Sequence, residues 1–222
     1  MDRDLLLTAH PVVYHMADDG TWPSIASHGL MSTRALVNLF DPPEDIRRSL
    51  LEQVRRTSTT LNHPSYGTVV VRDQGPLKFL DRCLTTGTTP QDFLNELNGR
   101  VFFWLSRDRL ERLLNGRRYR SRPQTVIHVD TGRLLRVYGD RVQLAPYNTG
   151  SMHVPTAPKR GADVFVDLDS YPYESWRKKR GPRQDAVVEL TVPDAVPDIA
   201  DLVVRVERWV AGRPTEVLYP VS

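Results

Sequence analysis

Alternating apolar and polar positions identify the strand around which we interpret this chain, within residues 185–199 (DAVVELTVPDAVPDI). Val187, Glu189 and Thr191 share one face of this strand, and the positions between them form an apolar face. Such alternation among β-branched residues is typical of a strand, which Pro193 ends because proline has no N–H to donate. Burying an ionised carboxylate without a partner is costly. Glu189 is therefore either a functional residue or a solvent-facing residue of an edge strand.

Further short runs of β-branched and aromatic residues predict the other strands. The most apolar of them is VFFWL, at residues 101–105. We expect strands at 11–16, 68–72, 101–105, 125–129, 142–144, 164–168, 187–192, 201–206 and 217–219.

Apolar residues spaced three or four positions apart predict helices. The first helix is expected to end at Gly29, and Thr33 is expected to cap the second. Residues 146–158 and 171–182 are polar and contain several prolines and glycines, so we expect loops there. The helices are expected at 22–28, 34–40, 44–56, 76–83, 90–97 and 108–114.

Helices are thus expected to crowd the N-terminal half of the chain and strands the second half. This order is typical of an α+β fold rather than of alternating βαβ units. A length of 222 residues suits a single domain, 1–222. The hydrophobic fraction of 40% and the charged fraction of 26% are ordinary for a globular protein. Neither G-x-G-x-x-G nor G-x-x-x-x-G-K-[ST] occurs, which argues against a Rossmann or P-loop fold.

Cysteine content and hydropathy narrow the class of protein further. Cys83 is the single cysteine, which excludes an internal disulfide framework and a cysteine-based zinc site. No apolar run approaches the ~20 residues that span a bilayer, and residues 1–15 lack the basic segment of a secretory signal. His15 and His28 do not have the i, i+4 spacing of helical metal ligands. We expect a cytoplasmic protein with no membrane association and no metal.

Several hydrolytic centres are poorly matched by the sequence. Residues 149–153 (TGSMH) lack the second glycine of the G-x-S-x-G elbow of serine hydrolases. Cys83 lies on an apolar helix face and is expected to be structural, although a Cys83–His dyad stays open as an alternative. A glycoside-hydrolase pair would need a second carboxylate near Glu189, for which Asp167 and Asp169 are the candidates.

A set of motifs along the chain resembles the ADP-ribosyltransferase superfamily, most closely the DarT-like branch of bacterial toxin transferases. The order and spacing of the motifs extend over most of the chain. One departure is Ser106-Arg107-Asp108, which replaces the proline-serine-proline continuation of the family's aromatic strand. The matching motifs are Tyr14-His15-Met16, Gly29-Leu30, Val101-Phe102-Phe103-Trp104, and Val188-Glu189-Leu190-Thr191-Val192 followed by Val196-Pro197.

The resemblance implies an ADP-ribosyltransferase-like split β-sandwich core and a glycosyltransferase reaction with NAD as substrate and no metal. It implies that Glu189 is the catalytic carboxylate, assisted by Arg72, a role for which Arg34 is the alternative. It also implies a toxin or phage-defence effector with an antitoxin partner. The residues expected to bind NAD are Tyr14, His15, Arg72, Phe103, Trp104 and Asn148.

These residue types fit the chemistry of that reaction. Cleaving the bond between ribose and nicotinamide spreads positive charge over the ribose, and a carboxylate facing that charge stabilises the transition state more than the ground state. An aromatic ring such as Phe103 or Trp104 can stack on nicotinamide, and His15 can bond a ribose hydroxyl. A planar guanidinium suits the diphosphate better than an ammonium does.

Two basic segments suggest a nucleic acid, single-stranded DNA or RNA, as the acceptor. Residues 107–122 contain seven arginines and Tyr119, and residues 176–183 place five basic side chains beside Trp176. Basic side chains interleaved with aromatic rings suit a single strand. A solvated basic face, a non-catalytic nucleic-acid-binding module, and a related fold acting on an RNA 2′-phosphate or on a protein stay open as alternatives. The expected nucleic-acid contacts are Arg117, Arg118, Arg120, Arg177, Lys178, Lys179 and Arg180.

Overall fold

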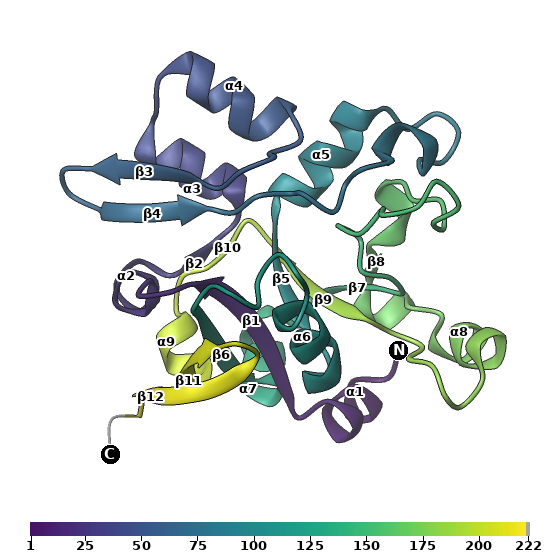
Figure 1. The fold of residues 1–222 in the computed structure, drawn as a ribbon. Coiled ribbons are helices and arrows are strands. Elements are labelled where there is room, and N and C mark those ends of the chain that lie inside the picture. The colour runs from purple at the N-terminus through teal and green to yellow at the C-terminus, as the bar shows by residue number, and fades with distance from the viewer. Residues whose placement is uncertain (221–222) are drawn as a thin grey trace.

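Eight strands form one antiparallel sheet in the computed structural model, which describes residues 1–220 (Figure 1). Neighbours in this sheet are mostly distant in sequence, so long-range pairing organises the fold. In spatial order the strands are β12 (Arg213–Tyr219), β11 (Val203–Val210), β6 (Gln124–Asp130), β1 (Val12–Asp18), β5 (Arg100–Trp104), β9 (Glu189–Pro193), β7 (Gln143–Ala145) and β8 (Val166–Asp167).

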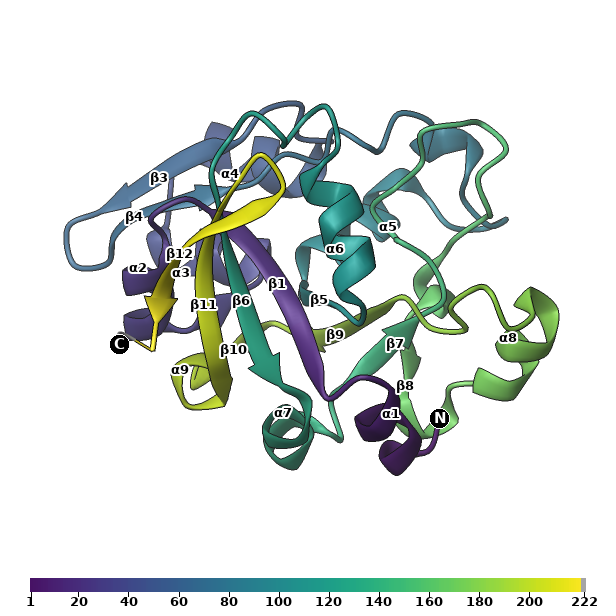
Figure 2. The ribbon, with the colours of Figure 1, turned by 60° about the horizontal axis from the view of Figure 1, so that its bottom comes forward.

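The sheet consists of two four-stranded halves that are joined at one residue pair. β1 and β6 are paired along their whole length, from Val12 opposite Asp130 to Asp18 opposite Gln124, and β5 and β9 are paired at five positions. β1 and β5 share only the pair Tyr14–Trp104. In Figure 2, β1 accordingly runs steeply through the molecule, whereas β9 lies across it. The two halves diverge away from this pair.

Two short ribbons lie outside the main sheet. β2 (Leu30–Met31) pairs with β10 (Ala195–Val196), and β3 (Thr59–His63) pairs with β4 (Gly67–Val71). The β3–β4 hairpin packs with two helices on a small core of its own, above the main sheet in Figure 1. The buried residues of this core are Val37, Phe40, Leu50, Leu61 and Val71.

Nine α-helices surround the strands within residues 1–220. Local signals set several of their ends. Thr89 and Asp92 form a capping box at the start of α5, and Asp130 accepts a hydrogen bond from the N–H of Arg133 at the start of α7. No helix of this region is both long and apolar enough to cross a membrane. The helices are α1 (Arg3–Ala9), α2 (Trp22–His28), α3 (Thr33–Phe40), α4 (Glu44–Glu52), α5 (Pro90–Asn98), α6 (Arg107–Leu114), α7 (Thr131–Tyr138), α8 (Tyr173–Arg180) and α9 (Ile199–Leu202). Short 3₁₀ turns lie at η1 (Leu80–Arg82), η2 (Ala162–Val164) and η3 (Leu168–Ser170).

One face of the sheet carries the main hydrophobic core. Val13, Phe103, Ile127, Leu190 and Val192 all have no exposed surface and belong to one cluster. Because side chains alternate across a strand, the residues between them lie on the opposite face. Glu189 and Trp104 lie on that opposite face.

The α+β class is confirmed, together with most of the expected strands and helices. Several expectations about the helices were wrong, and the helix expected at 44–56 ends at Glu52. Ser32, not Thr33, caps α3 through a bond from the N–H of Ala35, and residues 76–83 contain only the 3₁₀ turn η1. Residues 171–182, expected to be a loop, contain α8. Because α7, α8 and α9 lie in the second half of the chain, the helices are less concentrated in the first half than expected.

Candidate functional site

Glu189 lies in the interior of the sheet, not on an edge strand. β9 runs between β5 and β7, and Glu189 is paired with Trp104 on one side and with Ala145 on the other. The residue is only 5% exposed. The interpretation of Glu189 as a solvent-facing edge residue is therefore wrong, and the fold must compensate a buried carboxyl group.

Thr149 provides the hydrogen bonds that Glu189 receives. Its backbone N–H donates to Oε2 of Glu189 at 3.1 Å, and its hydroxyl donates to the same oxygen at 2.7 Å. Burial nevertheless dominates and raises the pKa of Glu189 to about 7, while these two bonds and the charge of Arg160 oppose the rise. A carboxyl group with a pKa near neutrality is typical of functional sites.

Glu189 lines a cavity of about 340 Å³ between the sheet and the β3–β4 layer. The cavity lining combines apolar residues of α2, α3 and β4 with a few polar groups, as in most small-molecule sites. Five of the residues expected at the NAD site reach this cavity: His15, Arg72, Trp104, Asn148 and Glu189.

His15 contributes a neutral imidazole to the cavity. Its Nδ1 lies 2.9 Å from the carbonyl oxygen of Phe102, and because a carbonyl only accepts, Nδ1 carries the hydrogen. The Nε2 atom is then an acceptor. Burial, with a contribution from the charge of Arg72, lowers the pKa of His15 to about 4, so the ring is uncharged at neutral pH.

Arg72 stands at the end of β4 and reaches across to β1. Its Nη1 donates to the carbonyl oxygen of Met16 at 3.0 Å, and its Nε lies 3.8 Å from Oδ2 of Asp18. The guanidinium carbon lies 4.9 Å from the ring centroid of Tyr119. Arg72 therefore holds a fixed position in the cavity wall, and its acidic partner is Asp18. The alternative Arg34 is exposed and donates to the carbonyl oxygen of Asn95.

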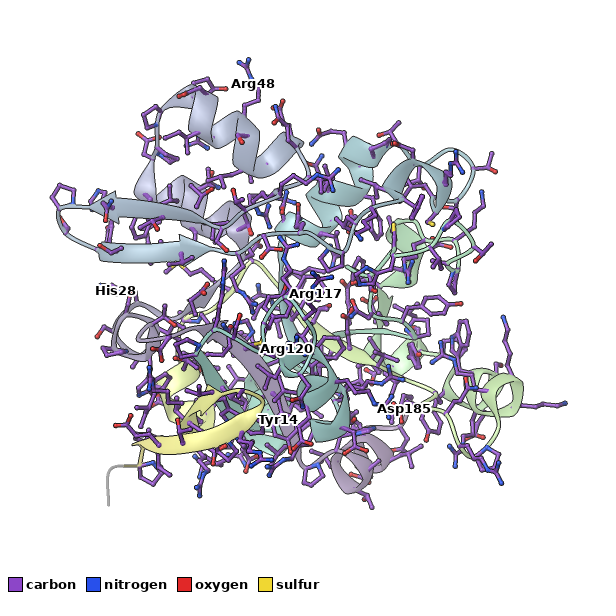
Figure 3. The ribbon with its side chains drawn as sticks, in the orientation of Figure 1. Tyr14, His28, Arg48, Arg117, Arg120 and Asp185 are labelled. Carbon is purple, nitrogen blue, oxygen red and sulfur yellow. The ribbon has the colours of Figure 1, made fainter. Side chains whose placement is uncertain are left out.

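Two aromatic residues expected at the site lie elsewhere. Phe103 is fully buried in the main core on the other face of β5, and its neighbour Phe102 lines the cavity instead. Tyr14 does not reach the cavity, because its ring packs edge-on against His128 at a centroid distance of 5.1 Å. Figure 3 shows Tyr14 low on the sheet, away from His28 on the cavity side. Phe103 and Tyr14, which were expected to bind NAD, are therefore not part of the cavity lining.

Within loop 146–151, which was expected to be a loop and to contribute Asn148, the sequence did not reveal the role of Thr149, and it did not reveal that of Arg160 either. Arg160 is 4% exposed, and its guanidinium donates to the carbonyl oxygens of Asn148 and Pro158, each at 3.1 Å. It therefore anchors the loop that presents Thr149 to Glu189. Asn148, which the sequence predicted only as a ligand contact, directly precedes Thr149, and its carbonyl oxygen accepts a hydrogen bond from Arg160.

The two basic segments lie in different places. Figure 3 shows Arg117 and Arg120 near the centre of the view and Asp185 beside α8. Arg118 pairs with Asp73 at 2.7 Å. From the second segment, Lys179 and Arg180 line a separate groove, whereas Arg177 and Lys178 are exposed and do not line it.

Chemically, the 340 Å³ cavity can hold an elongated ligand with both apolar and anionic parts. Its lining includes three carboxyl groups (Asp18, Asp73 and Glu189), three guanidinium groups (Arg55, Arg72 and Arg100), the imidazoles of His15 and His28, and the rings of Phe40, Tyr66, Phe102 and Trp104. Within residues 1–220 no three histidine, cysteine or acidic side chains gather in a way that would hold a metal ion.

Residues 11–203 match the model of a family of unknown function, DUF7002. The chain therefore belongs to this family, and the matched region includes Glu189, Arg72, His15 and Asn148. No curated protein matches the chain.

Proposed function

We propose that this chain is an NAD-dependent mono-ADP-ribosyltransferase that modifies a nucleic acid and releases nicotinamide. The observation that carries the proposal is the buried Glu189 carboxyl group in a cavity that also contains the Arg72 guanidinium and the neutral His15 ring. The order of the motifs along the chain supports it as well. The pair Tyr14–Trp104, where the two halves of the sheet meet and then diverge, suits a split ADP-ribosyltransferase-like core.

In this proposal, the bond between C1′ of the ribose and the nicotinamide nitrogen breaks, and nicotinamide leaves with the electron pair. The positive charge that develops on the ribose is stabilised by the ionised Glu189 in a site of low dielectric. An oxygen or nitrogen of the acceptor then forms a bond to C1′ and loses its proton. Within residues 1–220, Oε1 of Glu189 receives no hydrogen bond, so it is free to accept one from a ribose hydroxyl.

The other cavity residues have matching roles. Arg72 bonds the diphosphate, Nε2 of His15 accepts a hydrogen bond from a ribose hydroxyl, and the rings of Phe102 and Trp104 pack against planar parts of NAD. The pKa of about 7 for Glu189 fits this use, because the positively charged nicotinamide ring of bound NAD favours the ionised carboxylate.

A toxin or phage-defence role with an antitoxin partner belongs to the same proposal and rests on the resemblance to DarT-like transferases. The alternatives are a non-catalytic nucleic-acid-binding module and a related fold acting on an RNA 2′-phosphate or on a protein. The decisive experiment is to incubate the full chain with NAD and to measure free nicotinamide, first alone and then with single-stranded DNA, RNA or a protein extract. Nicotinamide release supports the transferase, and binding without release supports the module.

A further inference from the structure

A second cavity, a groove of about 820 Å³, borders loop 146–151, which also borders the cavity that contains Glu189. Its walls come from the start of α6, from residues 146–160, and from the stretch 176–188. Asn148 lines both cavities, and Val188, which lines the groove, directly precedes Glu189. The two cavities therefore meet at the loop that supports the carboxyl group.

The groove is strongly cationic. Its lining contains two acidic side chains, Asp108 and Asp185. Asp185 already pairs with Arg109, at 2.5 Å. The lining contains six cationic side chains: Arg109, Arg112, Arg160, Lys179, Arg180 and Arg183.

Arg160 is an independent sign that an anion binds here. It is 96% buried, because only 4% of its surface is exposed, and within residues 1–220 no carboxylate lies within ion-pair distance of it. Its Nε has no hydrogen-bond partner in the same region. Its guanidinium donates to two carbonyl oxygens and lies over the Tyr147 ring, and the charge of Glu189 acts on it from beyond ion-pair distance. Burying a cation without a direct carboxylate partner is costly, and an anion in the groove would offset part of that cost.

Two aromatic rings are embedded among these cations. Tyr147 and Trp176 pack edge-to-face with a centroid distance of 5.5 Å. The Arg180 guanidinium lies 5.2 Å from the ring centroid of Tyr147 and 4.9 Å from that of Trp176, and Lys179 lies 4.8 Å from that of Trp176. Rings and guanidinium planes of this kind stack on nucleobases, while the positive charges meet phosphates.

We infer that this groove binds a nucleotide through its phosphate and its base, and that it holds the acceptor beside Glu189. The combination of a planar ring surface with an excess of positive charge selects a nucleotide over an acidic peptide, which supplies charge without a base. The role as acceptor site rests on the proposed function, whereas nucleotide binding by the groove does not. The nucleotide is either free or part of a single strand.

The test measures binding to the full-length Glu189→Gln variant without NAD, so that turnover plays no part. The probes are a fluorescent nucleoside 5′-monophosphate and a fluorescent single-stranded oligonucleotide, with inorganic phosphate as competitor. The groove variant is Lys179→Gln with Arg183→Gln. Its matched control is Arg177→Gln with Lys178→Gln, which removes the same charge from neighbouring positions outside the groove lining.

We expect the groove variant to weaken binding by about tenfold or more, and Trp176→Ala to weaken it similarly, as loss of phosphate and stacking contacts predicts. The control is expected to change binding less than about twofold. If the groove variant weakens binding of the monophosphate probe, the occupant of the groove is a free nucleotide. If it weakens binding of the oligonucleotide alone, the occupant is a single strand.

Equal effects of the two double variants, or no binding of either probe at low salt, would overturn the inference. Loss of binding only on neutralising Arg117 and Arg120 would also overturn it. Nicotinamide release is measured separately, so failure of the groove and failure of the proposed function are distinguishable.

Discussion

Thr149 donates both its backbone N–H and its hydroxyl to a single oxygen, Oε2, of the buried Glu189 carboxyl group, at 3.1 and 2.7 Å. The pair joins a loop to the middle strand of one half of the sheet, across 40 residues of sequence. Both bonds favour the ionised carboxylate, which burial disfavours. Thr149 thereby increases the fraction of Glu189 that is charged at neutral pH.

Replacing Thr149 by Val tests this relationship, since valine keeps the shape and loses the hydroxyl. A hydrogen bond to a charged group contributes roughly 1.5–3 kcal/mol, which is about one to two pKa units. In the pH profile of nicotinamide release, kcat/KM should rise with pH through an apparent pKa near 7 for the parent chain. For Thr149→Val this midpoint should move up by about one unit or more, and Thr149→Ser should restore it. An unshifted midpoint in Thr149→Val would show that the hydroxyl does not control Glu189.

The raised pKa of Glu189 also predicts how stability depends on pH. The folded pKa of about 7 lies above the ordinary value of 4.5, so the fold favours the protonated form. The corresponding stabilisation is complete below about pH 4.5 and is lost as pH rises through 7. A difference of this size is on the order of 3 kcal/mol.

Glu189→Gln should therefore be more stable than the parent at pH 8.5 by roughly 1–3 kcal/mol and nearly equal to it at pH 4.5. Urea unfolding of both proteins at the two pH values measures this difference. The comparison between variants cancels the titration of the other groups. A Glu189→Gln chain that follows the parent curve at both pH values would mean that the carboxyl group titrates normally.

Arg72 is expected to bind the diphosphate of NAD. Arg72→Ala should weaken NAD binding by about 1.5–3 kcal/mol, the range for a charge-assisted contact, and Arg72→Lys should recover only part of it, because an ammonium lacks the planar fork. Calorimetric titration in the Glu189→Gln background measures the affinity. Arg48→Ala is the matched control, because Arg48 lies on α4 at the top of Figure 3 with a 59% exposed side chain. If Arg72→Ala and Arg48→Ala bound NAD with equal affinity, Arg72 would not contact the diphosphate.

The neighbouring residues Phe102 and Phe103 are expected to behave differently, because they lie on opposite faces of β5. Phe103 is fully buried in the core, so Phe103→Ala should cost about 3–5 kcal/mol of stability. Phe102 lines the cavity, and Phe102→Ala should mainly weaken NAD binding. Thermal unfolding and NAD titration of both variants check this contrast. If Phe103→Ala weakened binding without lowering the melting temperature, the assignment of the two faces would be reversed.

Much of the fold could be predicted from the sequence because local patterns carry it. The alternation in 187–192 identified β9, and α2 (Trp22–His28) has the predicted bounds. α8 was missed because none of its side chains is buried, so it has no apolar stripe to recognise. Its signals are Pro172 before the first turn and Gly181, whose φ of 72° ends the helix. α7 had a clearer signal in the Asp130 cap.

The candidate site was harder to predict, because tertiary packing determines it. The resemblance pointed to Glu189 and His15 by motif and to Arg72 by an approximate match, and all three line the cavity. It could not show which face of VFFWL points to the cavity, because that face follows from the register of Trp104 opposite Glu189. Thr149 and Arg160 gave no signal either, since a threonine and an arginine in a polar loop are usually solvated. Their roles depend on a loop folding against a distant strand.

The most direct test of the central claim is the rate of nicotinamide release from NAD by the parent chain and by Glu189→Gln at pH 8, where the parent carboxyl group is ionised. Removing the charge that faces the ribose should lower the rate on the order of 10²–10³-fold. The remote control Glu216→Gln, at an exposed position of β12, should retain the parental rate. If Glu189→Gln folds normally and releases nicotinamide as fast as the parent, or if the parent releases none with any acceptor, Glu189 is not the catalytic carboxylate of a transferase.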